Sequence, residues 1–368
     1  MSEFPISPDP RELSKRQRPQ SEANNLAFQF SGNGYEYFKI WIVNITLTIL
    51  TFGIYSAWAK VRRKRYFYRN TSLHGSAFEY TADPIAILKG RLIAFAVFAT
   101  YAGIVNLYPL AKPFLWLIFI PMLPWVVIRS LKFNALNSAY RNIHFNFTAP
   151  YQEALIVYVL IPVTLIFTLG FSYPWFDYRR RKLIIENHRY GQSVFQMNAP
   201  LSAFYKLYGF ALLIFIVGSI FTFFLYFTMP PLIKGNESWI ELRGTLFDHA
   251  SVWLMPGFGF LIYLSLVAFL LARLQNLVWN SSSLEKIRFE SQLTDSGMFW
   301  LYLSNSLAIM VTMGLFIPWA QVRMVRYRIE RLKAISNESI DRFLASEQQK
   351  SSATGDEVSE IFDLDISI

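Results

Sequence analysis

Long uncharged, apolar stretches alternate with short basic clusters along most of this chain. The seven longest runs without Asp, Glu, Lys or Arg cover residues 40–59, 92–111, 113–128, 154–176, 207–233, 249–272 and 296–322. Most of these runs reach the ~20 residues that a helix rising ~1.5 Å per residue needs to cross a ~30 Å hydrocarbon core. The pattern therefore predicts a mainly α, polytopic membrane protein.

Two pairs of these runs are predicted to form helical hairpins. Only Lys112 separates the second run from the third, and Pro109 and Pro113 flank this lysine. Proline next to a polar residue favours a tight turn between two helices. We expect one hairpin over 85–128 and a second over 204–272.

An internal repeat accounts for the other three runs. Residues 51–58 read TFGIYSAW, residues 168–175 read TLGFSYPW, and residues 312–319 read TMGLFIPW. Equal spacing predicts an equal local backbone conformation, in repeat units of about 28–80, 145–197 and 289–333. The shared glycine and tryptophan positions are Gly53, Trp58, Gly170, Trp175, Gly314 and Trp319.

Basic residues follow each tryptophan at fixed spacing. Four residues after Trp come Arg62, Arg179 and Arg323, and three further on come Arg65, Lys182 and Arg326. A shorter version joins Trp125 to Arg129, and a degraded one joins Phe269 to Arg273. Thirty residues before each of the three repeat tryptophans lies a phenylalanine, at Phe28, Phe145 and Phe289.

Short β-hairpins are predicted after four of these helix ends. An asparagine is followed by a phenylalanine in the pairs Asn70 and Phe78, Asn137 and Phe145, Asn187 and Phe195, and Asn280 and Phe289. The segments TSLHGSAF and HRYGQSVF carry a central glycine and alternating apolar positions, which favours hairpins. We expect them at the cytoplasmic surface of the membrane.

These motifs resemble the YjgN-like family of bacterial inner-membrane proteins, a domain of unknown function. The resemblance rests on FKIWIVNITLTILTFGIYSAWAKVRRKRYFYRNTSLHGSAFEY, on GFSYPW with ENHRYG, and on GLFIPWAQVR with RYRIERL, and it runs from about Phe28 to Lys333. It implies a multi-pass protein of the bacterial inner membrane. The family has no assigned activity, so the resemblance transfers no chemistry.

Composition and charge narrow the functional classes. The chain is 53% hydrophobic and 16% charged, below the roughly 25% charge of a soluble domain. Its net charge of +10 lies mostly beside the apolar runs, as in cytoplasmic flanks of membrane segments, so we expect membrane lipids and not nucleic acid as partners. The sequence does not indicate protein partners. The Pro-rich, charged segment 1–25 and the Ser-rich, acidic segment 336–368 are expected to be disordered tails around a membrane domain over 26–335.

Two interpretations of the repeated motif remain open. In the first, the glycine breaks or closely packs a helix, the tryptophan lies at the headgroup boundary, and the basic side chains contact lipid phosphate. In the second, the basic side chains form a binding ring for an anionic solute or lipid headgroup. The candidate contacts are Arg62, Arg65, Arg129, Arg179, Lys182, Arg323 and Arg326.

Catalytic chemistry has little support in this sequence. The histidines 74, 144, 188 and 249 show no paired spacing, cysteine is absent, and neither a phosphate-binding glycine loop nor a nucleophile elbow occurs. We therefore expect no enzyme, no catalytic residue, no metal site and no cofactor.

Transport and scaffolding are the two functions left. The first is a transporter-like protein or one that handles lipids or anionic solutes, and the alternative is a non-catalytic membrane scaffold or envelope factor. A transporter or channel predicts a wet, polar cavity lined by several repeats, whereas a scaffold predicts a filled membrane core. Positive charge on the segments 60–91, 177–206 and 323–337 favours three repeat segments that enter and leave on the cytoplasmic side, each with a helical arm and a near-extended return. The alternative is that these segments cross the membrane fully.

Overall fold

The computed structural model describes residues 24–233, 240–336 and 341–349. Its secondary structure is mainly helical, and its elements follow the order strand, helix, helix, strand five times. The first two units consist of β1 (Asn24–Phe30), α2 (Gly34–Leu50), α3 (Ser56–Arg69) and β2 (Thr71–Leu73), then β3 (Ser76–Tyr80), α4 (Pro84–Leu107), α5 (Lys112–Leu136) and β4 (Ser138–Tyr140).

The remaining three units keep this order with helical arms of unequal length. The third begins with β5 (Ile143–Phe147), continues through α6 (Tyr151–Leu155), a π-helical turn (Ile156–Leu160), α7 (Ile161–Phe167) and α8 (Tyr173–Glu186), and ends with β6 (His188–Tyr190). The last two contain β7 (Ser193–Met197), α9 (Leu201–Ile233), α10 (Ile240–Asn280) and β8 (Ser282–Leu284), then β9 (Ile287–Ser291), α11 (Asp295–Val311), α12 (Ile317–Ile329) and β10 (Leu332–Ser336).

All ten strands pair into one closed antiparallel barrel, in the order β1-β10-β9-β8-β7-β6-β5-β4-β3-β2. The first and last strands of each unit pair with each other, so that Phe28 lies opposite Leu73 and Phe145 opposite Tyr190. Tight turns join each unit to the next. The four predicted hairpins are present as β2–β3, β4–β5, β6–β7 and β8–β9. They are not separate, however, because each of their strands also pairs with a strand far away in the sequence, which closes the sheet into one barrel.

Side chains alternate between the two faces of the barrel. Along β1, Leu26, Phe28 and Phe30 are partly or fully buried, while Ala27 and Gln29 are exposed. This period of two places apolar side chains inside and polar ones outside. The barrel therefore has an apolar interior and a water-facing outer surface, and it lies outside the hydrocarbon region.

A backbone contact at the strand-to-helix junction recurs in all five units. The N–H group of the first residue after the initial strand donates to the carbonyl oxygen of the residue at the end of the second helix or just after it. The pairs are Ser31 to Asn70, Thr81 to Asn137, Thr148 to Asn187, Asn198 to Ser281 and Gln292 to Arg331, at 2.8–3.0 Å. Both helices of every unit thus start and finish at the same rim of the barrel.

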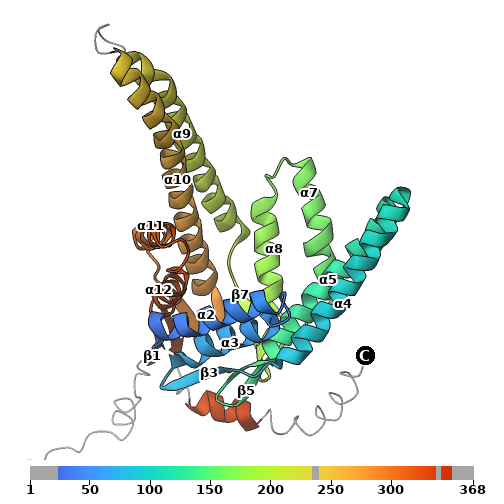
Figure 1. The fold of residues 1–368 in the computed structure, drawn as a ribbon. Coiled ribbons are helices and arrows are strands. Elements are labelled where there is room, and N and C mark those ends of the chain that lie inside the picture. The colour runs from blue at the N-terminus through green and yellow to red at the C-terminus, as the bar shows by residue number, and fades with distance from the viewer. Residues whose placement is uncertain (1–23, 234–239, 337–340, 350–368) are drawn as a thin grey trace, which may run out of the picture.

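The helices form a second ring beyond that rim. The second helix of each unit contacts the first helix of the next, as α3 does α4, α8 does α9 and α10 does α11, and α12 packs against α2 to close the ring. The α4–α5 and α9–α10 hairpins extend furthest from the barrel and diverge from each other (Figure 1).

Four helical segments are long and apolar enough to cross a membrane. They are Pro84–Leu107, Pro109–Leu136, Leu201–Phe224 and Gly257–Asn280. Their side chains are largely exposed, as expected of surfaces that face lipid. They coincide with the two predicted helical hairpins.

The three shorter hairpins turn at the repeated Thr-x-Gly motif. Gly53, Gly170 and Gly314 have φ angles of 92°, 87° and 95°, which favour glycine because it has no Cβ. In all three turns, the glycine N–H donates to the carbonyl oxygen five residues earlier at 2.8 Å. The expectation of one shared local conformation is thus confirmed, whereas the near-extended return is wrong, because α3, α8 and α12 return as helices.

The tips of these hairpins carry apolar side chains with no protein cover. Phe52, Leu169 and Met313 precede the three glycines, and they are 98%, 88% and 96% exposed. Such exposure is costly in water and favourable in lipid. Each hairpin also returns to the rim that it left, as entry and exit on one side of the membrane require.

The chain ends differ from the expected tails where they are described. β1 starts at Asn24, inside the segment expected to be disordered, and residues 341–349 form a helix beneath the barrel (Figure 1). Residues 1–23 and 350–368 lie outside the described part of the chain. The disorder prediction therefore does not hold for 24–25, for Ser336 at the end of β10, or for 341–349.

Candidate functional site

A cavity of about 520 Å³ occupies the interior of the barrel. All five units contribute to its wall. The wall is formed mainly by aromatic and aliphatic side chains, among them Phe28, Phe78, Phe145, Phe195, Phe289, Leu73, Tyr140, Tyr190, Leu284 and Ala334. Notably, the five phenylalanines occupy the middle of the first strand in each unit.

Aromatic contacts hold this lining in place. The ring centroids of Phe28 and Phe78 are 6.2 Å apart, and those of Phe195 and Phe289 are 6.1 Å apart. Phe78 also stacks on Tyr140 at 4.7 Å. These distances lie in the range of favourable ring pairs, so neighbouring rings in the wall stabilise one another.

Two of the three tyrosine hydroxyl groups in the lining donate to acceptors in the protein, and the third, on Tyr68, accepts a hydrogen bond from Ser138 Oγ at 3.1 Å. The Tyr140 hydroxyl donates to the carbonyl oxygen of Leu73 at 2.7 Å, and the Tyr190 hydroxyl donates to that of Tyr140 at 3.1 Å. Burial raises the pKa of both phenols, so they stay neutral. The middle of the cavity consequently presents apolar surface.

Polar lining residues gather at the helix-bearing rim. Thr71, Asn134, Ser138 and His188 all lie at helix-to-strand junctions. His188 Nδ1 lies 2.6 Å from the carbonyl oxygen of Ile184, so Nδ1 carries the hydrogen, and burial lowers the pKa of the imidazole. The cavity therefore has a polar end beside the membrane helices and an apolar middle.

A lysine reaches the same polar end. Lys64 Nζ donates to Asn134 Oδ1 at 2.5 Å and lies 4.6 Å from the centre of the Tyr80 ring. Burial, together with the neighbouring charges of Lys60 and Arg63, lowers the pKa of Lys64 to about 8. At neutral pH Lys64 thus remains mostly protonated, as a partly desolvated cation near the polar end of the cavity.

Several repeated basic residues bind backbone carbonyls instead of gathering around a ligand. Arg65 donates to the carbonyl oxygens of Tyr80 and Ala82, and Arg326 donates to that of Gly32. Ala82 is the second residue after β3, and Gly32 is the second residue after β1, so each arginine reaches the same position in the neighbouring unit. These arginines therefore fasten neighbouring units together.

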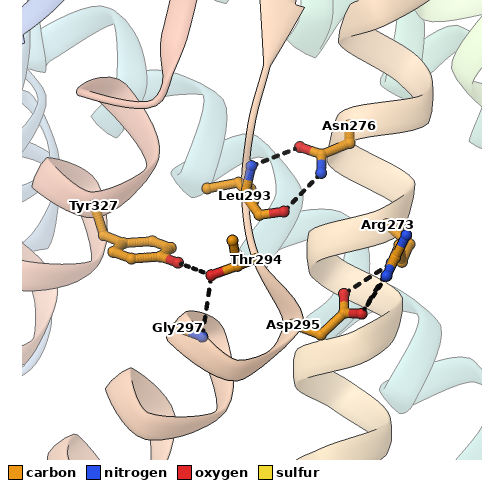
Figure 2. Close-up of polar contacts among 7 residues, drawn as sticks. All are labelled: Arg273, Asn276, Leu293, Thr294, Asp295, Gly297 and Tyr327. Carbon is orange, nitrogen blue, oxygen red and sulfur yellow. Dashed lines mark hydrogen bonds and ion pairs between the residues drawn. The ribbon is translucent and has the colours of Figure 1, made fainter.

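Asn276 has the equivalent position on α10 and makes the equivalent contact. Its side chain donates to the carbonyl oxygen of Leu293 at 2.8 Å and accepts from the N–H of the same residue at 3.0 Å (Figure 2). One turn earlier, Arg273 forms a bidentate ion pair with Asp295 at 2.6–2.9 Å. These polar contacts join α10 to the loop between β9 and α11 and to the first residue of α11.

Four of the five other candidate anion contacts have a partner within their own unit. Arg62 donates to the Tyr55 hydroxyl, Arg129 lies over the Trp125 ring, and Arg323 donates to Asn305 and Ser304. Lys182 pairs with Glu186 at 3.7 Å, and Arg179 is partly exposed on α8. Each of these contacts therefore joins groups of a single unit.

The motif tryptophans pack against protein. The Trp319 ring lies 5.0 Å from Phe38, and a Cβ on Gly34 would come within 2.2 Å of it, so a glycine is required there. Trp58 stacks on Tyr55, and Trp175 packs against the buried cluster around Phe147. The sequence interpretation of these tryptophans as headgroup anchors misses these contacts.

One buried ionic cluster joins the third and fourth units. Asp177 is 1% exposed and accepts hydrogen bonds from Arg180 and Arg181, both at 2.7 Å, and from the Tyr208 hydroxyl at 3.1 Å. Burial alone would raise the pKa of Asp177, but the two arginines lower it below its ordinary value. Among the described residues, no group of three or more metal-ligating side chains occurs.

Sequence reasoning found the five phenylalanines but not their shared role. Their positions indicated the spacing of the repeats and the hairpins. This spacing alone did not indicate that the strands close around one interior. The recurrence of one aromatic position in every unit was the available signal.

Comparisons with known proteins extend over most of the chain. A family model described as "Bacterial protein of unknown function (DUF898)" matches residues 25–361. Inner membrane protein YjgN of Salmonella typhimurium is 25% identical over 354 residues, which cover 83% of this chain and 87% of that protein. Inner membrane protein YjgN of Escherichia coli O157:H7 is 30% identical over 145 residues, which cover 39% of this chain and 36% of that protein. No solved structure matches the chain.

Proposed function

Because this chain belongs to the bacterial DUF898 family and its similar proteins are inner-membrane proteins, we propose that it binds the apolar part of a membrane lipid inside its barrel. The observation that carries this proposal is the 520 Å³ apolar cavity, which all five units line. Its volume lies in the range of about 300–1,000 Å³ that is usual for small-molecule sites.

The chemistry of the lining favours a hydrocarbon chain over a water-soluble ligand. Transfer of apolar surface into such a cavity gains ~0.8 kcal/mol per CH₂ group relative to water. The hydroxyls of Tyr140 and Tyr190 donate to acceptors within the protein, so they add no polar site in the middle of the cavity. A lipid chain in the cavity would therefore contact apolar side chains along most of its length.

The position of the polar residues supports one orientation of the lipid. Thr71, Asn134, Ser138 and His188 lie at the rim next to the membrane helices, and Lys64 is close by. A lipid that enters from the membrane side would keep its headgroup at this rim and extend its chain toward the turns of the barrel. The partly desolvated Lys64 would favour an anionic headgroup.

This proposal narrows the lipid-handling function that was expected from the sequence. A transporter-like function called for a polar cavity, and the barrel cavity is apolar. The scaffold function called for a filled membrane core, whereas the hollow barrel lies outside the hydrocarbon region. Lipid handling is the part of the original expectation that these observations support.

Lipid analysis of a pair of matched variants tests the proposal. Ala334→Trp fills the cavity, because Ala334 is 1% exposed in its wall, whereas Ala77→Trp adds the same side chain to the exposed outer face of β3. After purification in mild detergent, mass spectrometry should find a lipid at a fixed ratio to the original protein and to Ala77→Trp, and much less with Ala334→Trp. Equal lipid content in all three proteins would overturn the proposal.

A second variant covers the case in which Ala334→Trp does not fold. Phe289→Ala enlarges the cavity without adding bulk to the barrel. The copurifying lipids should then shift toward longer or bulkier chains, whereas an unchanged lipid profile would contradict binding in the barrel.

A further inference from the structure

The helix at residues 341–349 covers the rim of the barrel opposite the membrane helices. Figure 1 shows this helix in red beneath the strands. Its first residue, Asp341, accepts a hydrogen bond from Arg141 at 2.8 Å and lies 3.9 Å from His74 Nε2. Arg141 and His74 belong to the tight turns that join the first three units.

A buried glutamate fixes the other end of the helix. Glu347 is 0% exposed, and its Oε2 accepts the backbone N–H groups of Gln192 at 2.8 Å and Ser193 at 3.2 Å. Gly191 in the same turn has a φ of 58°, and a Cβ there would lie 2.6 Å from Glu347 Oε2. The β6–β7 turn is thus shaped to receive this carboxylate.

Two apolar side chains between these anchors complete the cavity wall. Phe343 stacks on Tyr190, with ring centroids 6.4 Å apart, and Leu344 is 7% exposed. Both residues line the same cavity as the five strand phenylalanines. Arg342 and Ala345, in contrast, are exposed. The helix therefore has one face toward the cavity and one toward water.

We infer that the 341–349 helix is a removable plug that controls access to the barrel cavity from the rim of the turns. A helix of nine residues is too short to be stable alone in water, since isolated helices need ~12–15 residues. Its helical structure depends on docking, so undocking also unfolds it. Loss of either carboxylate anchor weakens docking and exposes the cavity.

This inference rests on the proposed function for the identity of the contents, but the closure itself can be measured without any ligand. The chain has no cysteine, so a single Ala334→Cys places one thiol in the cavity wall. The rate at which a small water-soluble thiol reagent modifies it in purified protein reports opening of the barrel.

The Ala334→Cys variant is compared in three backgrounds: the otherwise unchanged chain, a variant without the anchors, and a control. Asp341→Asn with Glu347→Gln removes both charged anchors, and Arg342→Gln removes an exposed charge of the same helix as a matched control. We expect modification of Ala334→Cys to accelerate roughly tenfold or more in the background without the anchors, since three charge-assisted hydrogen bonds to the two carboxylates are weakened. The control should change it less than twofold.

A cysteine on the outer face separates opening from unfolding. Ala77→Cys should react at the same rate in every background if the barrel stays folded. If the anchor variant does not fold, Leu344→Ala serves instead and should also accelerate modification. Equal rates for Ala334→Cys with and without the anchors would overturn the plug, whether or not a lipid copurifies.

Discussion

Arg326 on α12 donates a hydrogen bond to the carbonyl oxygen of Gly32, 2.7 Å away, and so fastens the last unit of the ring to the first. The Tyr37 hydroxyl donates to Gln321 Oε1 at 2.9 Å across the same seam. Below these contacts, β1 pairs with β10. Closure of the molecule thus depends on groups almost 300 residues apart.

Loss of the Arg326 contact should weaken this seam. We expect Arg326→Ala to lower the free energy of unfolding by about 1–2 kcal/mol, because a charged donor is lost and a backbone acceptor is left without it. Thermal unfolding in detergent measures the change. The control is Arg62→Ala, whose donor bond to Tyr55 is exposed and should cost less than about 0.5 kcal/mol. Equal effects of the two substitutions would argue against a role in closure.

The Thr-x-Gly turn should not tolerate a Cβ. Gly53→Ala should destabilise the protein by about 1–2 kcal/mol, since the φ of 92° is strained for any L side chain although nothing lies within 4 Å of the added carbon. Gly90→Ala, in α4 and also without close neighbours, should be neutral or slightly stabilising. Unfolding midpoints of the two variants, compared with that of the original protein, measure the cost of the backbone strain. Equal midpoints for Gly53→Ala and Gly90→Ala would contradict it.

The buried Asp177 should stabilise the protein in a pH-dependent way. Asp177→Asn should cost about 1–3 kcal/mol at neutral pH, because Arg180 and Arg181 lose their partner, and Tyr208→Phe should cost less. The pKa of Asp177 is lowered in the folded state, so its contribution is present above the unfolded value of ~3.9 and is lost as pH falls through the folded value.

Chemical unfolding of the original protein and Asp177→Asn over a pH series measures this difference. The gap between them should stay constant from pH 7 to about 5 and shrink below about 4. A gap that widens on acidification would show that the folded-state pKa is raised instead.

The membrane topology can be tested with single cysteines. All five units start and end at the barrel, so cysteines at Gln196 and Glu79, on its exposed outer face, should behave alike. A cysteine at Leu110, which is 87% exposed at the far end of the α4–α5 hairpin, should lie on the other side. In intact cells an impermeant thiol reagent should modify only the Leu110 variant. Modification of the Gln196 variant but not of Glu79 would contradict this arrangement.

Local features were predictable from the sequence, and closure was not. The Thr-x-Gly spacing indicated three turns with one geometry, because a backbone position of positive φ favours glycine and so appears in the local sequence. The proline-flanked Lys112 indicated a helical hairpin in the same way. Phe28 was placed in register with Phe145, but its partner Leu73 lies 45 positions away across two helices. Strands of three to seven residues carry too little pattern to specify such pairing.

The candidate site escaped prediction for a related reason. A cavity needs the three-dimensional arrangement of all five units, whereas the sequence presents each phenylalanine alone. The basic residues beside the apolar runs favoured an anion site instead, because their positive charge is visible in the sequence. Their acceptors, such as the carbonyl oxygen of Gly32, are backbone atoms that leave no trace in the sequence.

The pairing of β1 with β10 has a consequence for how the chain is made. The ribosome releases residues 24–30 first among the described strands and residues 332–336 last, so the growing barrel keeps an open edge until β10 has been made. Unpaired strand edges invite association with other chains. Newly made protein therefore depends on the early insertion of its apolar helices, because anchorage at the membrane keeps each open edge close to its own final strand and apart from those of other copies.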